Sequence, residues 1–465
     1  MDGVFTMTMM HYFGAIIILV IISAIGIYSG KKIKTAGDFS SGGRQTGADI
    51  VVGTIMGALV GGASTVGTAQ LAFNYGLSAW WFTLGSGLGC LVLAVFFVKP
   101  LYESGATTLP QIFAWEYGQK ASTLVAVLTS IGNFLTIAAQ VLSGMALITS
   151  VSSLEPAFSA VLITLLMLAY IVFGGVWGAG LVGIAKTLLL YIGMGVCGVL
   201  AISLQGGLEN FYQVLPAKQY FNLFARGFGI DFGGCLSVIL GVLTTQAYIQ
   251  AVISAKSVKV SKKGVLLCSA FIPPIGAAGI LVGLYMKINY PLIDPASALP
   301  VFIMESLPPL VAGAFLAILL ITVVGSGAVL SLGISSMLCN DLYKVYINKN
   351  PSDEKQLYYT RVFIVLIMLA ALLVTAANTG AMILDFTYLS MGLRGAVAFG
   401  PLCMALFMPG RLGKEYTIIS MVVAPVLVAA GGLFLSQNID PLFLGVAGSL
   451  LIIEIGLVAG KKKAV

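Results

Sequence analysis

Apolar runs of about 20 residues recur along almost the whole chain, and each is long enough to cross a bilayer as one helix. Backbone N–H and C=O groups inside lipid must be satisfied within the protein, which favours helices over irregular structure. Only 9% of the 465 residues are charged, whereas soluble domains carry roughly 25%. The sequence therefore predicts an all-α integral membrane protein with about thirteen transmembrane helices. They are expected near 10–30, 47–74, 77–99, 121–150, 155–174, 176–203, 228–253, 264–287, 309–339, 359–379, 382–408, 415–436 and 440–460.

Basic residues gather in alternate connections between these spans. By the positive-inside rule, the basic connections lie in the cytoplasm, so the N-terminus is expected outside and the C-terminus inside a plasma (inner) membrane. The net charge of +7 is then a topology signal, and no nucleic-acid partner is expected. The basic set includes Lys31, Lys32, Lys34, Arg44, Lys99, Lys120, Lys256, Lys259, Lys262, Lys263, Lys344, Lys349, Lys355, Arg361, Arg411, Lys414 and Lys461 to Lys463, whereas the opposite connections hold Lys218, Arg226 and Lys287.

The residue types that carry most enzyme chemistry are scarce in this chain. His11 is the single histidine, and the six cysteines are scattered singly through apolar stretches. A membrane-embedded metalloenzyme needs clustered His and acidic residues. We therefore expect a transporter rather than an enzyme, with no organic cofactor. A channel would need a pore loop or an acidic ring, and a membrane sensor would need an output domain. Both alternatives are therefore less favoured than a transporter.

Two of the predicted helices are interrupted by small residues in similar ways. The stretch 54–70 has glycines near its middle, and the stretch 231–250 has glycines followed by Thr244, Thr245 and Gln246. The two lie five helices apart and therefore cross the membrane in opposite directions. Paired discontinuous helices in antiparallel positions indicate an inverted-repeat transporter that binds its solute at the midplane. The alternative is that the glycines only allow close helix packing.

Four short motifs resemble segments of the sodium:solute symporters, which carry proline, sugars and sialic acid, and the similarity spans roughly residues 35–410. Ala251 stands where the family often has Arg. The motifs are Asn74-Tyr75-Gly76-Leu77-Ser78, Tyr170-Ile-Val-Phe-Gly-Gly175, Gln246-x-x-x-Gln250 followed by Ser254-Ala255-Lys256-Ser257, and Gly333-Ile-Ser335-Ser336 leading to Asp341-Leu342-Tyr343-Lys344.

This resemblance implies the LeuT-type fold, in which two five-helix repeats of opposite orientation form the core and the first and sixth core helices are discontinuous. The expected division is an extra N-terminal helix with a basic cytoplasmic loop, a first repeat, an extracellular loop, a second repeat, and two C-terminal helices with a basic tail. The corresponding ranges are 1–46, 47–203, 204–227, 228–408 and 409–465. The oligomeric state stays open, with a monomer among the options.

The resemblance also implies one Na⁺ between core helices one and eight, held by backbone carbonyls and by hydroxyls of an Ala-x-x-Ser-Ser/Thr segment. Carried over to this chain, the carbonyls would come from Ala63 and Val66, and the helix-eight positions are Thr322, Gly325 and Ser326. A hard cation needs several oxygen ligands. Because Gly325 has no side chain, one hydroxyl ligand is missing.

A second departure from the family lies in core helix five. The family typically has Trp-Thr-Asp-x-x-Gln, whereas this chain has Leu181, Val182 and Gly183, with Lys186 at the Gln position. Lys186 follows Gly175 by about 16 Å of helix, which places it near the middle of a ~30 Å core. We expect its amine to replace the sodium or to carry a proton, because isolated bases at this depth are usually functional. The alternatives are an ordinary Na⁺ site with relocated ligands and a structural lysine. The coupling ion is thus H⁺ or Na⁺.

Arg394 lies near mid-depth in the predicted helix 382–408. A buried guanidinium suits a carboxylate, which it can bind with two parallel hydrogen bonds. The alternatives are that Arg394 anchors backbone carbonyls or faces a cytoplasmic vestibule. The solute is expected to be a small carboxylate or amino acid. Other candidate substrate-binding residues are Ser64, Thr65, Gln70, Thr245 and Gln246 in the broken helices, and Gln140, a mid-span amide of the predicted helix 121–150.

Overall fold

The computed structural model describes residues 7–30, 44–435 and 438–463. Most of the basic connection that contains Lys31, Lys32 and Lys34 lies outside these ranges. Within them, nine helices are long and apolar enough to cross a membrane, or ten when one bent pair is taken as a single span. Three shorter apolar helices, Met9–Ala24, Ala48–Leu59 and Pro156–Ile171, accompany them. The all-α membrane fold is therefore confirmed, and the number thirteen stays a prediction.

The helices follow the predicted apolar runs closely, with one difference. Residues 155–174 and 176–203 were expected as two helices, but the structure has one continuous α9 (Pro156–Leu204). A straight helix of that length would measure about 74 Å, which is more than twice the hydrocarbon core. The remaining long helices are α1 (Met9–Gly30), α5 (Trp81–Val92), α8 (Gln119–Thr149), α14 (Val258–Asn289), α16 (Pro309–Leu338), α17 (Asp353–Ala377), α18 (Ile383–Phe407), α19 (Lys414–Phe434) and α20 (Leu442–Lys463).

Shorter elements complete the connections. Helix α5 continues through a π-helical turn, Leu93–Phe97, into α6 (Val98–Glu103), and α7 (Leu109–Tyr117) follows. The loop region 204–227 carries α10 (Leu208–Val214) and α11 (Ala217–Tyr220), and α15 (Ala298–Ser306) precedes α16. A further π-helical segment, Cys339–Ile347, extends α16.

Both helices with predicted interruptions are broken. The first consists of α3 (Ala48–Leu59), a π-helical turn at Ala63–Gly67 and α4 (Thr68–Tyr75). The second consists of α12 (Phe228–Thr244) and α13 (Gln246–Ser254), which meet at an angle of 47°. The backbone therefore leaves regular α-helical geometry in both helices at the expected place.

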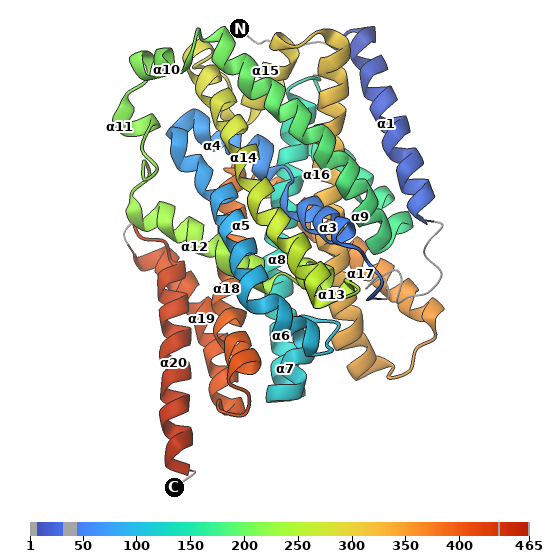
Figure 1. The fold of residues 1–465 in the computed structure, drawn as a ribbon, viewed down its shortest axis with the longest axis vertical. Coiled ribbons are helices and arrows are strands. Elements are labelled where there is room, and N and C mark those ends of the chain that lie inside the picture. The colour runs from blue at the N-terminus through green and yellow to red at the C-terminus, as the bar shows by residue number, and fades with distance from the viewer. Residues whose placement is uncertain (1–6, 31–43, 436–437, 464–465) are drawn as a thin grey trace.

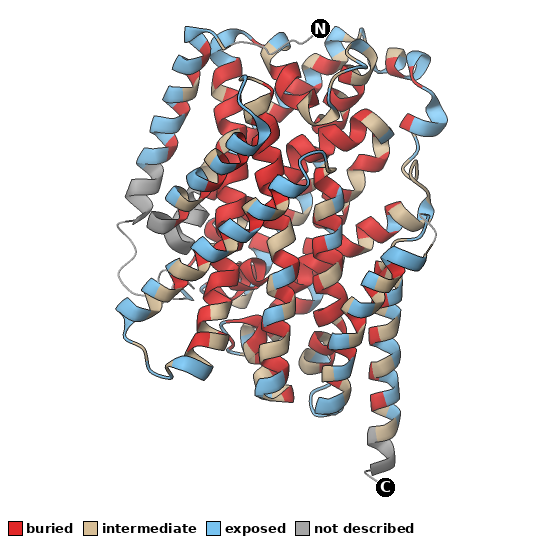
Figure 2. Ribbon diagram, turned by 180° about the vertical axis from the view of Figure 1, so that it is seen from behind, coloured by how far each residue is buried: buried red, intermediate tan, exposed pale blue. Residues whose placement is uncertain are grey.

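Helix α16 lies in the centre of the molecule. In its most apolar stretch, 94% of the residues are buried, and α1, α8 and α9 pack against it. It approaches α1 closely because Gly14 and Gly313 face the opposite backbone, where any side chain would collide. Figure 2 shows the same pattern, with buried residues in the middle of the bundle and exposed residues around it. α16 can therefore contribute to a site that lipid does not reach.

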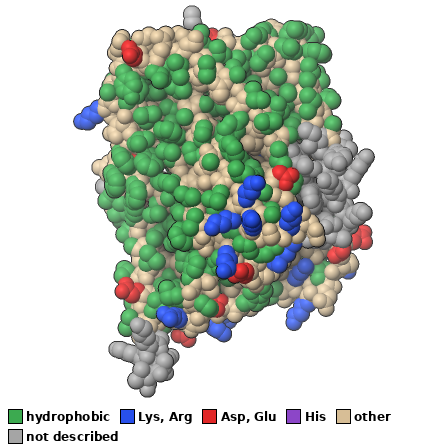
Figure 3. All heavy atoms as spheres, in the orientation of Figure 1, with side chains coloured by type: hydrophobic (Ala, Val, Ile, Leu, Met, Phe, Trp, Pro, Cys, Tyr) green, Lys and Arg blue, Asp and Glu red, His purple; other side chains and the backbone are tan. Residues whose placement is uncertain are grey.

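The two ends of the molecule differ in charge. Helix α1 begins at the upper end in Figure 1, and α20 extends to the lower end. In Figure 3, Lys and Arg side chains gather over the lower half of the visible face, and the upper half is mainly apolar. In the predicted orientation, which stays a prediction, this basic half would face the cytoplasm.

Candidate functional site

The break in the first discontinuous helix lies against α8. Helix α3 ends at Leu59, and the N–H of Gly62 donates to the side-chain oxygen of Gln140 at 2.8 Å. The hydroxyl groups of Ser64 and Thr65 donate to the carbonyls of Leu59 (2.9 Å) and Gly61 (3.0 Å), respectively. Buried polar groups need such partners. Ser64, Thr65 and Gln140, predicted as substrate ligands, thus already satisfy the opened backbone.

Lys186 lies between the first broken helix and α16, and only 2% of the residue is exposed. Its Nζ atom donates to the carbonyl oxygen of Gly57 at 2.6 Å and to that of Thr322 at 3.1 Å, and it lies 3.2 Å from Ser326 Oγ. An ammonium group has three N–H donors and no acceptor. The three oxygens therefore match a protonated amine, and within the described part of the chain Lys186 forms no ion pair.

Gly325 provides the room for this amine. A Cβ atom added to Gly325 would lie 3.2 Å from Lys186 Nζ and 3.5 Å from the hydroxyl oxygen of Tyr170. The first distance is tighter than ordinary carbon contacts, so a serine here would have to displace the amine. The missing hydroxyl and the new lysine, noted separately in the sequence, are thus neighbours in space.

Two carbonyls of the first broken helix contact α16 through Ser326, those of Gly57 and Val60. Ser326 Oγ donates to Gly57 O at 2.8 Å and lies 3.3 Å from Val60 O. The carbonyl of Ala63 instead accepts from the Thr68 hydroxyl at 3.0 Å. Ala63 and Val66 stay a prediction as ion ligands, and Gly57 and Val60 are further candidates, because the chain leaves α-helical geometry at Val60, before the π-helical turn.

Arg394 is completely buried on α18. Its Nε donates to the carbonyl of Ser390 at 3.1 Å, whereas Nη1 and Nη2 have no hydrogen-bond partner among the described residues. A Cβ on Gly132 of α8 would lie 2.4 Å from Arg394 Cγ, so the side chain runs closely along that helix. A buried guanidinium with two unpaired nitrogens is costly unless something binds it.

Thr245 and Gln246 lie at the break of the second discontinuous helix, but their side chains form hydrogen bonds with different segments. Thr245 Oγ1 donates to the carbonyl of Gly241 at 2.6 Å. Gln246 reaches the start of α7: its Oε1 accepts from the N–H of Leu109, the first residue of α7, at 2.8 Å, and its Nε2 donates to Thr107 O in the preceding loop at 3.3 Å. The amide of Gln246 therefore connects the broken helix to this loop.

Gln70 makes the corresponding connection in α4. Its side-chain oxygen accepts from the N–H of Ile383, the first residue of α18, at 3.0 Å. The structure thus brings Lys186, Thr322 and Ser326 together, holds Gln140 against the first break, and places Gln70, Thr245, Gln246 and Arg394 apart from that cluster. Sequence reasoning missed Gly57 and Val60, whose contribution is a backbone carbonyl and leaves no signature in the residue type.

The described residues contain no group of three or more His, Cys, Asp or Glu side chains that would hold a metal ion.

Comparisons with known proteins agree on one family. The family model described as "Sodium:solute symporter family" matches residues 39–423. The chain is 23% identical to the high affinity choline transporter 1 of Homo sapiens, over 86% of this chain and 73% of that protein. It is 24% identical to the sodium/proline symporter of Escherichia coli (strain K12), over 87% of this chain and 84% of that protein.

The solved structures show the same fold. A Na⁺-coupled sialic acid symporter in a substrate-bound, outward-open state matches with a TM-score of 0.83 and 19% identity, over 98% of each chain. A nucleobase-cation-symport family transporter matches with a TM-score of 0.59 and 14% identity, over 91% of this chain and 95% of that chain. The LeuT-type fold expected from the sequence is confirmed.

Proposed function

Because the chain belongs to the sodium:solute symporter family, and is thus a secondary active membrane transporter, we propose that it imports a small carboxylate or amino acid with the amine of Lys186 in place of the family's sodium ion. The observation that carries this proposal is the position of Lys186 Nζ between Gly57 O, Thr322 O and Ser326 Oγ. The amine joins the first broken helix to α16, which is where the family's ion would join them.

Replacement of the sodium ion by the Lys186 amine is reasonable on energetic grounds. A bound Na⁺ offsets the cost of several carbonyl dipoles that converge in a low-dielectric interior, and an ammonium with three donors can do the same. Gly325 removes a hydroxyl ligand and leaves space for the amine. A protonated Lys186 would hold the two helices together without an added ion, and release of its proton would free them to separate.

Proton coupling follows from this assignment. In an alternating-access cycle the cluster opens toward one side at a time, and an amine that exchanges its proton with that side would couple solute movement to the proton gradient. The competing assignment is an ordinary Na⁺ site that uses Ser326 Oγ and the carbonyls of Gly57 and Val60, which also converge here.

The solute class rests on Arg394. Its Nη1 and Nη2 atoms are buried without partners, and a carboxylate is the small group that both could bind at once. The solutes named for the two relatives are both small organic molecules. Proline carries a carboxylate, whereas choline is a cation.

Uptake into proteoliposomes under separate Na⁺ and pH gradients tests the proposal. The protein should accumulate its solute under an inward proton gradient without Na⁺, and Lys186→Gln should abolish that accumulation. Lys287→Gln is the matched control, since Lys287 lies over the ring of Phe73 and away from the cluster. Uptake that strictly follows Na⁺ and is unchanged in Lys186→Gln would refute the lysine assignment.

A further inference from the structure

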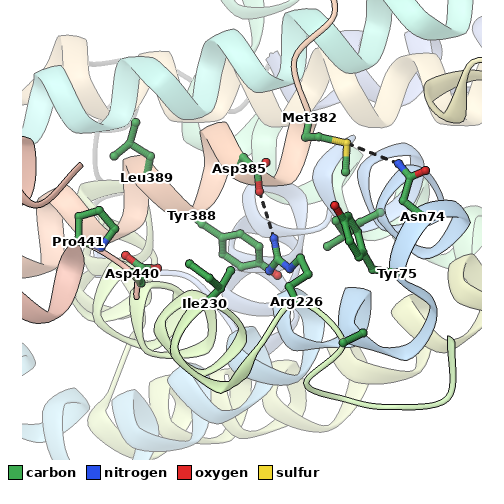
Figure 4. Close-up of a pocket in the computed structure, with 12 residues that line it drawn as sticks. Asn74, Tyr75, Arg226, Ile230, Met382, Asp385, Tyr388, Leu389, Asp440 and Pro441 are labelled. Atoms are coloured by element: carbon green, nitrogen blue, oxygen red, sulfur yellow. Dashed lines mark hydrogen bonds and ion pairs between the residues drawn. The ribbon is translucent and has the colours of Figure 1, made fainter. Parts of the chain in front are cut away.

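A second polar site lies in a cavity of about 740 Å³ beside the starts of α18 and α20. The end of α4, the loop before α12 and the loop before α20 also line it. Figure 4 shows its polar side chains turned toward one another. By the predicted orientation the loops that line this cavity are extracellular. The residues used below are Arg226, Ile230, Asp385, Tyr388 and Asp440.

Arg226 is the only base among these residues, and most of its charge is already neutralised. Its Nε donates to Asp231 Oδ1 at 2.8 Å, and its backbone N–H donates to Asp231 Oδ2 at 3.1 Å. Asp231 is fully buried and also accepts from the Ser78 hydroxyl at 2.7 Å. A second contact joins Arg226 Nη1 to Asp385 at 3.2 Å. Arg226 is thereby fixed in position.

Two donors in the cavity are nevertheless unused. Arg226 Nη2 and the Tyr388 hydroxyl have no hydrogen-bond partner among the described residues. The Arg226 side chain is 9% exposed and Tyr388 is 6% exposed, so neither group is freely hydrated. The guanidinium lies over the Tyr388 ring, 5.4 Å from its centroid, so both donors belong to one side of the cavity (Figure 4). An acceptor such as a carboxylate would satisfy both.

The remaining charge in the cavity is negative. Because Asp231 pairs with Arg226, the carboxylates of Asp385 and Asp440 are left in excess. Asp385 is 57% exposed at its side chain, and Asp440 packs against Gly233 of α12. A solute with only a negative charge would meet this excess, and a solute with only a positive charge would leave the two donors unused. A small zwitterion satisfies both parts of the cavity.

We propose that this outer cavity binds a small zwitterionic solute, such as an amino acid, with its carboxylate on Arg226 Nη2 and the Tyr388 hydroxyl and its ammonium group facing Asp385 and Asp440. This inference rests on the proposed function, since it names the class of solute that is transported and an initial binding site for it. Tyr388 and Arg394 lie on the same helix about 9 Å apart along its axis. A solute that leaves the outer cavity beside Arg226 and Tyr388 would therefore reach Arg394 by moving along α18.

A cysteine reporter measures occupancy of the cavity independently of transport. Ile230 lines the cavity and is partly exposed, whereas five of the six native cysteines are buried and Cys403 is only partly exposed. In a background without native cysteines, Ile230→Cys should react faster with a cationic, membrane-impermeant methanethiosulfonate than with an anionic one. Neutral amino acids such as L-alanine and L-proline should slow that reaction, and propionate or tetramethylammonium alone should slow it much less.

Variants separate the cavity from the deeper site. Tyr388→Phe removes one unused donor and keeps the ring, so protection by the amino acids should weaken about tenfold. Tyr212→Phe, which changes an exposed tyrosine of α10 that stacks on Phe221, is the matched control and should leave protection unchanged. Arg394→Lys should impair uptake and leave protection intact, because the outer cavity binds by itself.

Three outcomes would overturn the inference and leave the proposed function standing. Protection that disappears in Arg394→Lys but survives in Tyr388→Phe would show that only the deep site binds. Protection by tetramethylammonium equal to that by amino acids would identify a plain cation site. Absence of protection by any amino acid would show that the cavity does not hold such solutes. Conversely, strict Na⁺ coupling would refute the role of Lys186 without affecting protection at Ile230→Cys.

Discussion

Lys186 Nζ and the α-carbon of Gly325 face each other so closely that any side chain on the glycine would begin 3.2 Å from the amine. The lysine lies on α9 and the glycine on α16, and Lys186 forms no ion pair within the described residues. The two positions therefore act as a pair. A larger residue at one requires a smaller or shorter residue at the other.

The first prediction concerns this pair. Gly325→Ser should crowd the amine and reduce uptake about tenfold or more, because steric pressure in a packed core shifts neighbouring groups. Lys186→Met combined with Gly325→Ser should recover uptake and make it depend on Na⁺, since the double variant regains the hydroxyl and vacates the space of the amine. Uptake at several Na⁺ concentrations measures both effects.

Gly327→Ser is the control, because it lies on the same helix and its added side chain would meet Met167 instead. If the double variant stays inactive or stays independent of Na⁺ while it folds normally, the amine does not stand in for a sodium ion.

The second prediction concerns Arg394. Arg394→Gln should lower the affinity for a carboxylate solute by roughly 10- to 100-fold, because hydrogen bonds to a charged group contribute about 1.5–3 kcal/mol each. The maximal uptake rate should fall less than the affinity. Thermal-shift titrations with a series of carboxylates measure the affinity, and Arg411→Gln on the surface is the control. Equal affinity in the variant would mean that Arg394 only supports the helix packing around Gly132.

The sequence predicts those features that leave a periodic or local pattern. Apolar runs predicted most helices, because backbone N–H and C=O groups in lipid must form hydrogen bonds within the protein. The glycine-rich interruptions predicted both breaks. The pairing of Lys186 with the Gly325 segment was predicted from depth alone, since both positions lie about halfway through their helices.

Other features depend on which helix faces which and cannot be read along one chain. The contacts of the Gly57 and Val60 carbonyls could not be read from residue type, and the family resemblance named only Ala63 and Val66. Gln246 was expected in the solute site, but its amide reaches Leu109 at the start of α7, more than 130 residues away. The cavity around Arg226 and Tyr388 joins four separated segments, and in the sequence Arg226 is only one base in a loop.

The third prediction follows from that contact of Gln246. Its two hydrogen bonds connect the second broken helix to the start of α7 and the loop before it, and Thr46 and Ser254 join the far ends of the two broken helices by a contact of 2.9 Å between their hydroxyls. Gln246→Leu should loosen this end and favour a state open to the cytoplasm.

A cysteine at the buried position Thr65 reports this opening. In inside-out vesicles its reaction with a membrane-impermeant thiol reagent should accelerate several-fold in Gln246→Leu, because a lost pair of neutral hydrogen bonds is worth about 1–3 kcal/mol. Gln356→Leu removes another amide, which bonds Asn340, and should have no effect. An unchanged rate in Gln246→Leu would show that the loop does not restrict access.

The fourth prediction concerns pH and Asp440, which precedes α20 and lies outside the membrane-spanning segments. Burial raises the pKa of Asp440, and the nearby Asp385 raises it further, while the N–H of Leu442 and the charge of Arg226 act in the opposite direction. A carboxyl whose pKa is higher in the folded protein stabilises the fold in its protonated form. That contribution is complete below the pKa of the unfolded chain and is lost as the pH rises through the folded value.

Asp440→Asn keeps the oxygen that accepts from Leu442 N and is neutral at every pH. Its Tm should therefore exceed that of the wild type at neutral pH, and the difference should shrink as the pH falls toward about 4. Asp294→Asn is the matched control, because Asp294 makes a similar cap to Ala296 N on an exposed loop. Melting curves of both variants without solute, recorded across this pH range, measure the difference. A gap in Tm that is independent of pH, or a wild type that is the more stable at neutral pH, would mean that the surroundings of Asp440 favour its charged form.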